Sequence, residues 1–153
     1  MSDYNNLEAK LEAIFRNVLV AAIPAGLNHF TGLTDQLLQL PKSVCFCPTS
    51  AEVVIGSSVH RAQMQIQVES LGLDENNAAD SGAVLSAHQT RVAQVRDAIM
   101  RDDIIAVLNQ AAIDLAIEVT VIDLLNPSLV EDTESFNLRN ALNLEVIAAN
   151  ARI

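Results

Sequence analysis

Histidine and cysteine are the residues of this chain with the clearest potential for metal or nucleophilic chemistry. The histidines are His29, His60 and His88, and the cysteines are Cys45 and Cys47. Two thiols separated by a single residue lie on the same face of an extended strand, so together with His29 or His60 they could bind a zinc ion. Structural zinc sites usually combine closely spaced pairs, however, and a second pair is missing. We therefore expect no metal and interpret both cysteines as small buried residues.

The sequence contains no motif that is typical of a catalytic centre. A G-x-S-x-G nucleophile turn and a glycine-rich phosphate loop are both absent, and glycine occurs only 5 times. Asp102 and Asp103 are adjacent, so on a helix their carboxylates would diverge by about 100° and would not act as an acid–base pair. We therefore predict that the protein is not an enzyme and uses no cofactor.

The net charge of −10, from 9 Lys and Arg against 19 Asp and Glu, disfavours two classes of partner. A surface of this sign repels nucleic-acid phosphates and anionic membranes. The 153 residues, half of them hydrophobic, are enough for one domain, 1–153, that needs neither a disulfide nor a metal to fold. The sequence shows no secretory signal and no membrane span, so we expect synthesis in the cytoplasm.

Two longer helices and one short helix are predicted from the apolar spacing. Residues 5–23 read as an amphipathic helix that Pro24 and Gly26 end. A second helix is expected to begin near residue 81 or near residue 86, and its apolar stripe is Leu85, His88, Val92, Val95 and Ile99. Asp102 is the predicted N-cap of a short third helix through Gln110. Residues 34–40 could add a helical turn.

Alternation of apolar and polar residues predicts the strands. Residues 60–69 give the clearest pattern, and weaker candidates are 44–48, 53–55, 117–125 and 136–148. In 117–125 the expected core-facing residues are Ile117, Val119 and Val121, and residues 126–134 are expected to form a loop. Asn140 falls on the apolar side of the last strand, which predicts a bulge or an edge position. The predicted fold class is α+β, a mostly antiparallel sheet packed against two or three helices, with a long C-terminal β-hairpin.

The length of the last strand suggests self-association. A straight strand over 136–148 would span about 40 Å, close to the whole diameter of a domain of this size. Either that strand is strongly bent, or the hairpin projects beyond the core. An exposed hairpin edge is normally covered, so we favour an oligomer.

The candidate interface residues are polar. Gln63, Gln65 and Gln67 form an uncharged row on one strand, which is either solvated or packed against another protein, because neutral groups are cheaper to desolvate than ions. Basic candidates are Arg91 and Arg96 on the second helix, which pair with nearby acids or with a neighbouring subunit, and Arg139 on the last strand. An acidic loop contributes the remaining candidates, which are Glu131, Asp132 and Glu134.

The order of these segments resembles the tail-terminator (tail-completion) proteins of long-tailed bacteriophages. The resemblance covers nearly the whole chain. It is carried by the N-terminal helix, Leu40–Val44, the strand from His60 to Glu69, the segments His88–Met100 and Asp102–Ile104, and the hairpin near 117–148. These motifs are mostly core patterning, and other small neck proteins look similar at this level.

The resemblance implies a structural virion protein. It implies a ring-forming α+β subunit, six copies of which cap the tail tube, stop its polymerisation and contact the connector of the head. The expected partners are further copies of the chain, the tail-tube protein and the head–tail connector, with genomic DNA passing through the lumen without specific binding. The expected location is the tail or neck of the virion.

Two other interpretations remain open. Within the same class, the chain could be a head-to-tail joining protein or a tail-tube subunit. In a different class, it could be a small cytoplasmic enzyme or ligand-binding domain that uses His60 and the region of Cys45 and Cys47.

Overall fold

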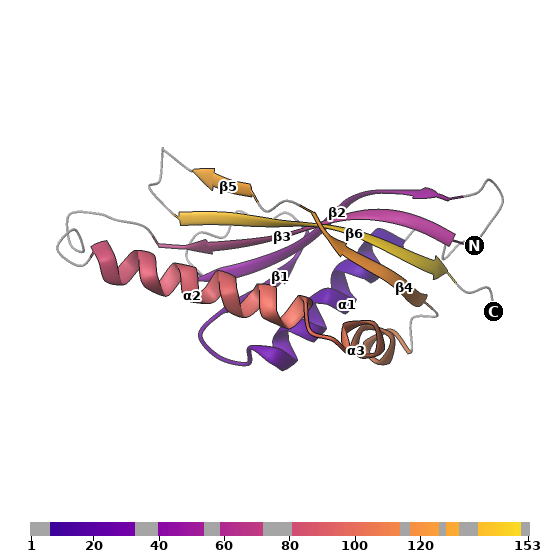
Figure 1. The fold of residues 1–153 in the computed structure, drawn as a ribbon, viewed down its shortest axis with the longest axis horizontal. Coiled ribbons are helices and arrows are strands. Elements are labelled where there is room, and N and C mark those ends of the chain that lie inside the picture. The colour runs from indigo at the N-terminus through magenta and orange to yellow at the C-terminus, as the bar shows by residue number, and fades with distance from the viewer. Residues whose placement is uncertain are drawn as a thin grey trace.

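The computed structural model has the predicted α+β architecture (Figure 1). It describes residues 7–32, 40–53, 59–71, 81–113, 117–125, 128–131 and 138–150. The elements in chain order are α1 (Leu7–Ala22), β1 (Asn28–Thr31), β2 (Lys42–Glu52), β3 (Val59–Ser70), α2 (Ser81–Ile99), α3 (Ile104–Ala111), β4 (Ile117–Leu124), β5 (Ser128–Glu131) and β6 (Leu138–Asn150).

The strands form one mixed sheet. Its order is β1-β2-β3-β6-β4, and β5 also pairs with β6. Among the described strands, only β1 and β2 run parallel, and the other pairs are antiparallel. Along β6, the stretch from Leu144 to Asn150 pairs with β4 and the stretch from Leu138 to Ala141 pairs with β5. The long C-terminal hairpin is therefore present, with its first arm divided into two strands.

The hairpin does not project from the core. β3 pairs with β6 from Leu138 to Ala149, so β6 lies inside the sheet with hydrogen-bonded neighbours on both sides. This corrects the expectation of a protruding arm, and with it the argument that an exposed hairpin needs a covering subunit. A surface other than the hairpin edge would have to mediate self-association.

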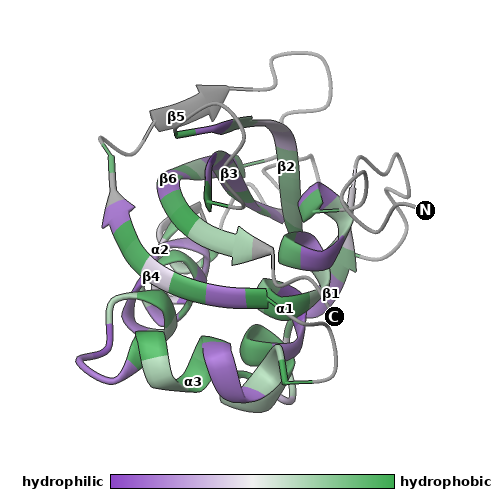
Figure 2. Cartoon of the chain, turned by 90° about the vertical axis from the view of Figure 1, so that its right-hand side faces the viewer, coloured by the Kyte–Doolittle hydropathy of each residue, from purple (hydrophilic) through white to green (hydrophobic). Residues whose placement is uncertain are grey.

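All three helices lie on one side of the sheet (Figures 1 and 2). Between helices and sheet is a mainly aliphatic core that includes Phe15 of α1, Ile66 of β3 and Leu144 of β6, each fully buried. The alternation of β3 and β6 sends one set of side chains into this core, as predicted. Ala62, Met64 and Val68 face it from β3, and Leu142, Val146 and Ala148 from β6.

α1 is joined to β2 by two carboxylates. The pairing of β2 with β3 slips between Phe46 and Thr49, and the backbone N–H of Cys47 there donates to Glu12 Oε2 at 2.9 Å. One turn earlier on the helix, Glu8 accepts a hydrogen bond from Ser50 at 2.7 Å. These bonds satisfy polar groups at the irregularity, which allows β2 to run through Pro48 as one strand.

Several strand predictions are wrong in detail. The segment expected at 44–48 extends from Lys42 to Glu52. Of the candidate strand at 53–55, Val53 lies outside β2, and residues 54 and 55 lie outside the described residues. β1 was not predicted, and β5 occupies part of the predicted loop. In β4 the register slips after Val119, so Val121 is exposed and Ile122 packs against the core instead. A bulge of one residue reverses the faces beyond it.

His88 fastens α2 to the sheet. Its Nδ1 lies 2.8 Å from Ser70 Oγ and its Nε2 lies 2.7 Å from Asn140 Oδ1. The amide oxygen of Asn140 can only accept, so Nε2 carries the proton and the Ser70 hydroxyl donates to Nδ1. Arg91 Nη1 in turn donates to Ser70 Oγ at 3.1 Å. The buried imidazole is held neutral, because burial lowers its pKa.

This network explains Asn140. The residue pairs with Val68 of β3 and with Leu129 of β5, so neither the bulge nor the edge position predicted for it exists. Asn140 faces the helices because it accepts the hydrogen bond from His88. Leu85, predicted to share the buried stripe of α2, is 47% exposed.

α3 is held at the outer edge of β4 by hydrogen bonds from the side chain of Asn109. Its Nδ2 donates to Val119 O at 3.0 Å and its Oδ1 accepts from Val119 N at 2.7 Å, which imitates a neighbouring strand. The N-cap of α3 is Asp103, not the predicted Asp102. The Asp103 carboxylate makes no capping hydrogen bond, because Arg101 binds both its oxygens, at 2.5 and 3.0 Å.

Asn109→Ala tests the contact between α3 and β4. The substitution leaves the N–H and C=O of the buried residue Val119 without their partner, so we expect the free energy of unfolding to fall by about 1–3 kcal/mol. Urea denaturation measures the change. Asn17→Ala, at an exposed position of α1, is the control and should cost less than about 0.5 kcal/mol. Equal losses for the two variants would contradict the proposed contact.

The stability of the fold should depend on pH through His88. Its pKa is lower in the folded chain than the usual 6.5, so between these two values the unfolded state binds more protons. The free energy of unfolding should therefore fall as the pH drops through about 6.5 and level off below the lowered pKa.

His88→Gln, which retains a donor for Asn140 but does not titrate, should reduce this slope. Denaturant titrations at a series of pH values from about 8 to about 4.5, which span the unperturbed pKa of about 6.5, measure how the free energy of unfolding depends on pH. A slope unchanged by the substitution would contradict the assignment. His29→Gln is a companion variant, because burial also lowers the pKa of His29.

Candidate functional site

The face of the sheet opposite the helices carries a set of polar side chains, which are exposed or half-buried from Arg61 to Gln67 and buried at Lys42 and Glu69. We call it the helix-free face and define it by Lys42 of β2, by Arg61, Gln63, Gln65, Gln67 and Glu69 of β3, and by Arg139, Asn143 and Glu145 of β6. In the part of the chain that the structure describes, no helix covers these residues (Figure 1). Their placement follows from the same alternation that sends the neighbouring apolar residues into the core.

The glutamines predicted as interface residues form a hydrogen-bonded ladder with β6. Gln63 lies opposite Glu145, and its Nε2 donates to Glu145 Oε2 at 3.5 Å. Gln65 lies opposite Asn143 and donates to Asn143 Oδ1 at 3.2 Å. Gln67 Nε2 donates to Gln65 Oε1 at 2.6 Å. The side chains are thus held in place by one another before any partner arrives.

Ionic contacts close the two ends of the ladder. At one end, Arg61 Nε lies 3.3 Å from Glu145 Oε1, in a half-exposed pair. At the other end, Glu69 Oε1 lies 3.8 Å from Lys42 Nζ and 3.3 Å from Arg139 Nη2. Lys42 and Glu69 are each 3% exposed. Arg139, predicted as an interface residue, therefore has a structural role, because its loss would leave a buried carboxylate with one cation fewer.

The helix-free face carries no excess of negative charge, unlike the protein as a whole. Its cations are Lys42, Arg61 and Arg139 and its carboxylates are Glu69 and Glu145, a net charge of +1, whereas the chain carries −10. Between the ionic ends lie only neutral amides, which lose less free energy on desolvation than ions do. Such a face can be covered by another protein surface without burying an unpaired charge.

The other predicted interface residues do not join this face. Arg91 and Arg96 lie on α2, on the opposite side of the sheet, where Arg91 bonds Ser70 and Arg96 Nε lies 3.8 Å from Asp97 Oδ1. Glu131 is the last residue of β5, and Asp132 and Glu134 lie outside the described residues. Sequence reasoning did not select Lys42, Asn143 or Glu145. The alternation of 136–148 placed Asn143 and Glu145 on a polar face, but not the register that sets them opposite the glutamines.

The cysteines lie on the core side of β2, and their chemistry is suppressed. Burial and the nearby Glu12 raise the pKa of Cys45 to about 12. Burial and the carboxylates of Glu8 and Glu12 do the same for Cys47, to about 12. Both thiols are therefore protonated at neutral pH, and the thiolate is the form that attacks or binds metals.

The histidines of the proposed zinc set are also poorly placed to bind a metal ion. Both ring nitrogens of His29 are engaged, Nδ1 with Ser43 Oγ at 2.7 Å and Nε2 with Ile23 O at 2.9 Å. His60 lies in β3, opposite Glu52 and Ala148. Among the described residues, no three His, Cys, Asp or Glu side chains are placed to hold a metal ion.

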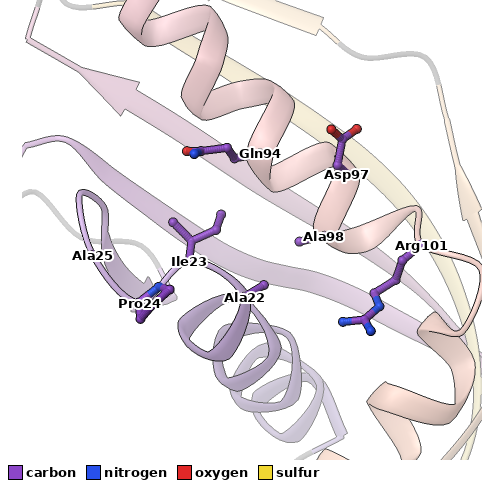
Figure 3. Close-up of a pocket in the computed structure, with 8 residues that line it drawn as sticks. All are labelled: Ala22, Ile23, Pro24, Ala25, Gln94, Asp97, Ala98 and Arg101. Carbon is purple, nitrogen blue, oxygen red and sulfur yellow. The ribbon is translucent and has the colours of Figure 1, made fainter.

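Two depressions can be described on the helix side, among the residues that the structure describes. One, of about 510 Å³, lies between the C-terminal ends of α1 and α2 (Figure 3). Arg101 extends toward it, whereas the carboxylate of Asp97 points away (Figure 3). The other, of about 370 Å³, is a mainly apolar groove between α1 and α3 that includes Val18, Ala21 and Val107. Neither combines a nucleophile with a general base, which a catalytic centre would require.

Among the residues described, none of the helices is both long enough and apolar enough to span a bilayer.

Comparisons with known proteins give a structural likeness. No protein-family model matches the chain, and no curated protein matches it. Among solved structures, it is similar to a chain in the virion of a native gene transfer agent particle, with a TM-score of 0.54 and 12% sequence identity. The likeness covers 91% of this chain and 93% of that chain. The two chains thus share a fold from end to end.

Proposed function

We propose that this chain is a structural subunit of a virion. Two observations of different kinds support the proposal. The fold matches, over nearly the full length of both chains, that of a protein within the virion of a gene transfer agent particle. Independently, the sequence resembles the tail-terminator proteins of long-tailed bacteriophages. The more specific proposal is that six copies form a ring at the end of the tail tube, stop its growth and join the tail to the head connector.

The helix-free face is the observation that carries this proposal within the molecule. Identical chains of charge −10 repel each other, so a contact between copies is favoured where the local charge is not negative. The face meets this condition, and its side chains are already held by one another, so little rotamer freedom is lost on association. If it meets a different surface of the next copy, the contact is heterologous, and such contacts close into a ring when the rotation closes.

The acidic surface away from this face suits a passage for DNA. Carboxylates do not bind phosphates, so a lumen lined by them would let genomic DNA move through without being held. The chain in this proposal makes no specific contact with nucleic acid and catalyses no reaction.

Two neighbouring roles use the same features. A head-to-tail joining protein or a tail-tube subunit would also need a contact face without excess negative charge. A tube subunit polymerises without limit, whereas a terminator stops at one ring. The enzyme or ligand-binding interpretation has less support, because the thiols of Cys45 and Cys47 are protonated and buried.

Gln65→Arg tests the role of the face. A long cation at its centre would be desolvated by a covering copy, so we expect association to weaken about tenfold or more, or about 1.4 kcal/mol. Gln94→Arg, at an exposed position of α2, makes the same change on the helix side and should associate like the unmodified chain. Light scattering over a concentration series, with and without isolated tail tubes, measures association.

The unmodified chain should form hexamers, or bind tube ends at a low copy number per tube. A chain that stays monomeric at all concentrations and does not bind tail tubes would contradict the proposed ring. Equal behaviour of the two arginine variants would show that a different surface makes the contact.

A further inference from the structure

The two edges of the sheet are partly closed by helix side chains. At β1, Arg16 Nε donates to His29 O at 3.1 Å. At β4, Asn109 bonds both the N–H and the C=O of Val119. Both contacts occupy backbone groups that point away from the sheet and would otherwise be open to a strand of another molecule.

The protection of β4 ends at its bulge. Beyond the bulge, β4 and β6 pair in register, and Leu125 N donates to Asn143 O at 2.7 Å. Hydrogen bonds between antiparallel strands involve every second residue. The backbone N–H and C=O groups of Val121 and Asp123 therefore also bond to β6, whereas those of Ile122 and Leu124 point away from the sheet. Within the described residues these outward groups have no partner strand, and β5 continues along the same edge.

The side chains beside this opening do not deter pairing. Val121 is 39% exposed and Leu125 is 40% exposed. Open edges are usually guarded by lysine, proline or a covering segment, and residues 117–125 contain neither lysine nor proline. Figure 2 shows β4 as an outer strand above α3. The edge from Val121 to Leu125 therefore has the features of a strand that accepts another strand.

The charge near this edge defines the partner. Between Arg101 and Arg139 the sequence has no Lys or Arg but eight acidic residues, namely Asp102, Asp103, Asp114, Glu118, Asp123, Glu131, Asp132 and Glu134. The formal charge of residues 102–138 is therefore −8, against −10 for the whole chain. Glu118 and Asp123 are both exposed on β4 itself. A second copy of this acidic chain would be repelled here, whereas a basic segment would be attracted.

We propose that the edge of β4 from Val121 to Leu125 binds an extended, Lys- or Arg-bearing segment of a partner protein by strand addition. The backbone groups of Ile122 and Leu124 would bond the segment, and its cations would lie near Glu118 and Asp123. The proposal does not depend on ring formation, because it uses a sheet edge and not the helix-free face.

A synthetic peptide of alternating Lys and Val, blocked at both ends, is the first probe. It should bind the full chain and slow amide hydrogen exchange at Ile122 and Leu124, measured by NMR. The matched probe is the same peptide N-methylated at two consecutive central residues. It keeps the charge but cannot pair on either edge, so its affinity should be lower by about tenfold or more.

A pair of variants localises the binding. Asp123 lies opposite Glu145, so Asp123→Lys gains a favourable neighbour and should fold normally. We expect it to weaken binding of the Lys-Val peptide several-fold more than Asp97→Lys, at an exposed position of α2. Equal affinity of the methylated peptide, no protection at Ile122, or equal effects of the two variants would overturn the proposal. Normal hexamer formation together with such a result would leave the ring proposal intact.

Discussion

The central constraint of this structure is the pairing of β6 on both sides. β3 follows it along one side, and β4 and β5 share the other. This arrangement fixes the register of the whole sheet, because a slip of one residue would move Leu142, Leu144 and Val146 out of the core. With that register set, the helices have one apolar face on which to pack. The remaining face is defined at the same time as polar.

The same pairing also assembles the polar face that we propose as an interaction surface. The glutamines of β3 meet Asn143 and Glu145 only because β6 lies beside them in this register. The side chains that could act as nucleophiles or metal ligands lie on the core side of the sheet. There Cys45 is buried and protonated, and both ring nitrogens of the buried His88 are hydrogen-bonded. The structure thus separates a rigid, aliphatic core from a self-paired polar face that is suited to contact with other chains.

Much of the fold could be predicted from periodicity, and the exceptions have physical reasons. α1, β3, β6 and the helix at 81–99 were predicted because their patterns are long and regular. β1 could not be, since Asn28–Thr31 has no alternation and is a strand only through its pairing with β2. Val121 was misassigned because the alternation continues through Thr120 and gives no sign of the bulge after Val119. For the site, the Gln63–Gln67 row was found, but its partners on β6 required the register.

The most direct test of the account is an electron cryomicroscopy map of the particle that contains this chain. The account predicts copies arranged in a closed ring on the particle axis, with Gln63, Gln65 and Gln67 of each copy covered by a neighbouring chain. A map in which these glutamines face solvent in every copy, or in which the chain is absent from the particle, would contradict it.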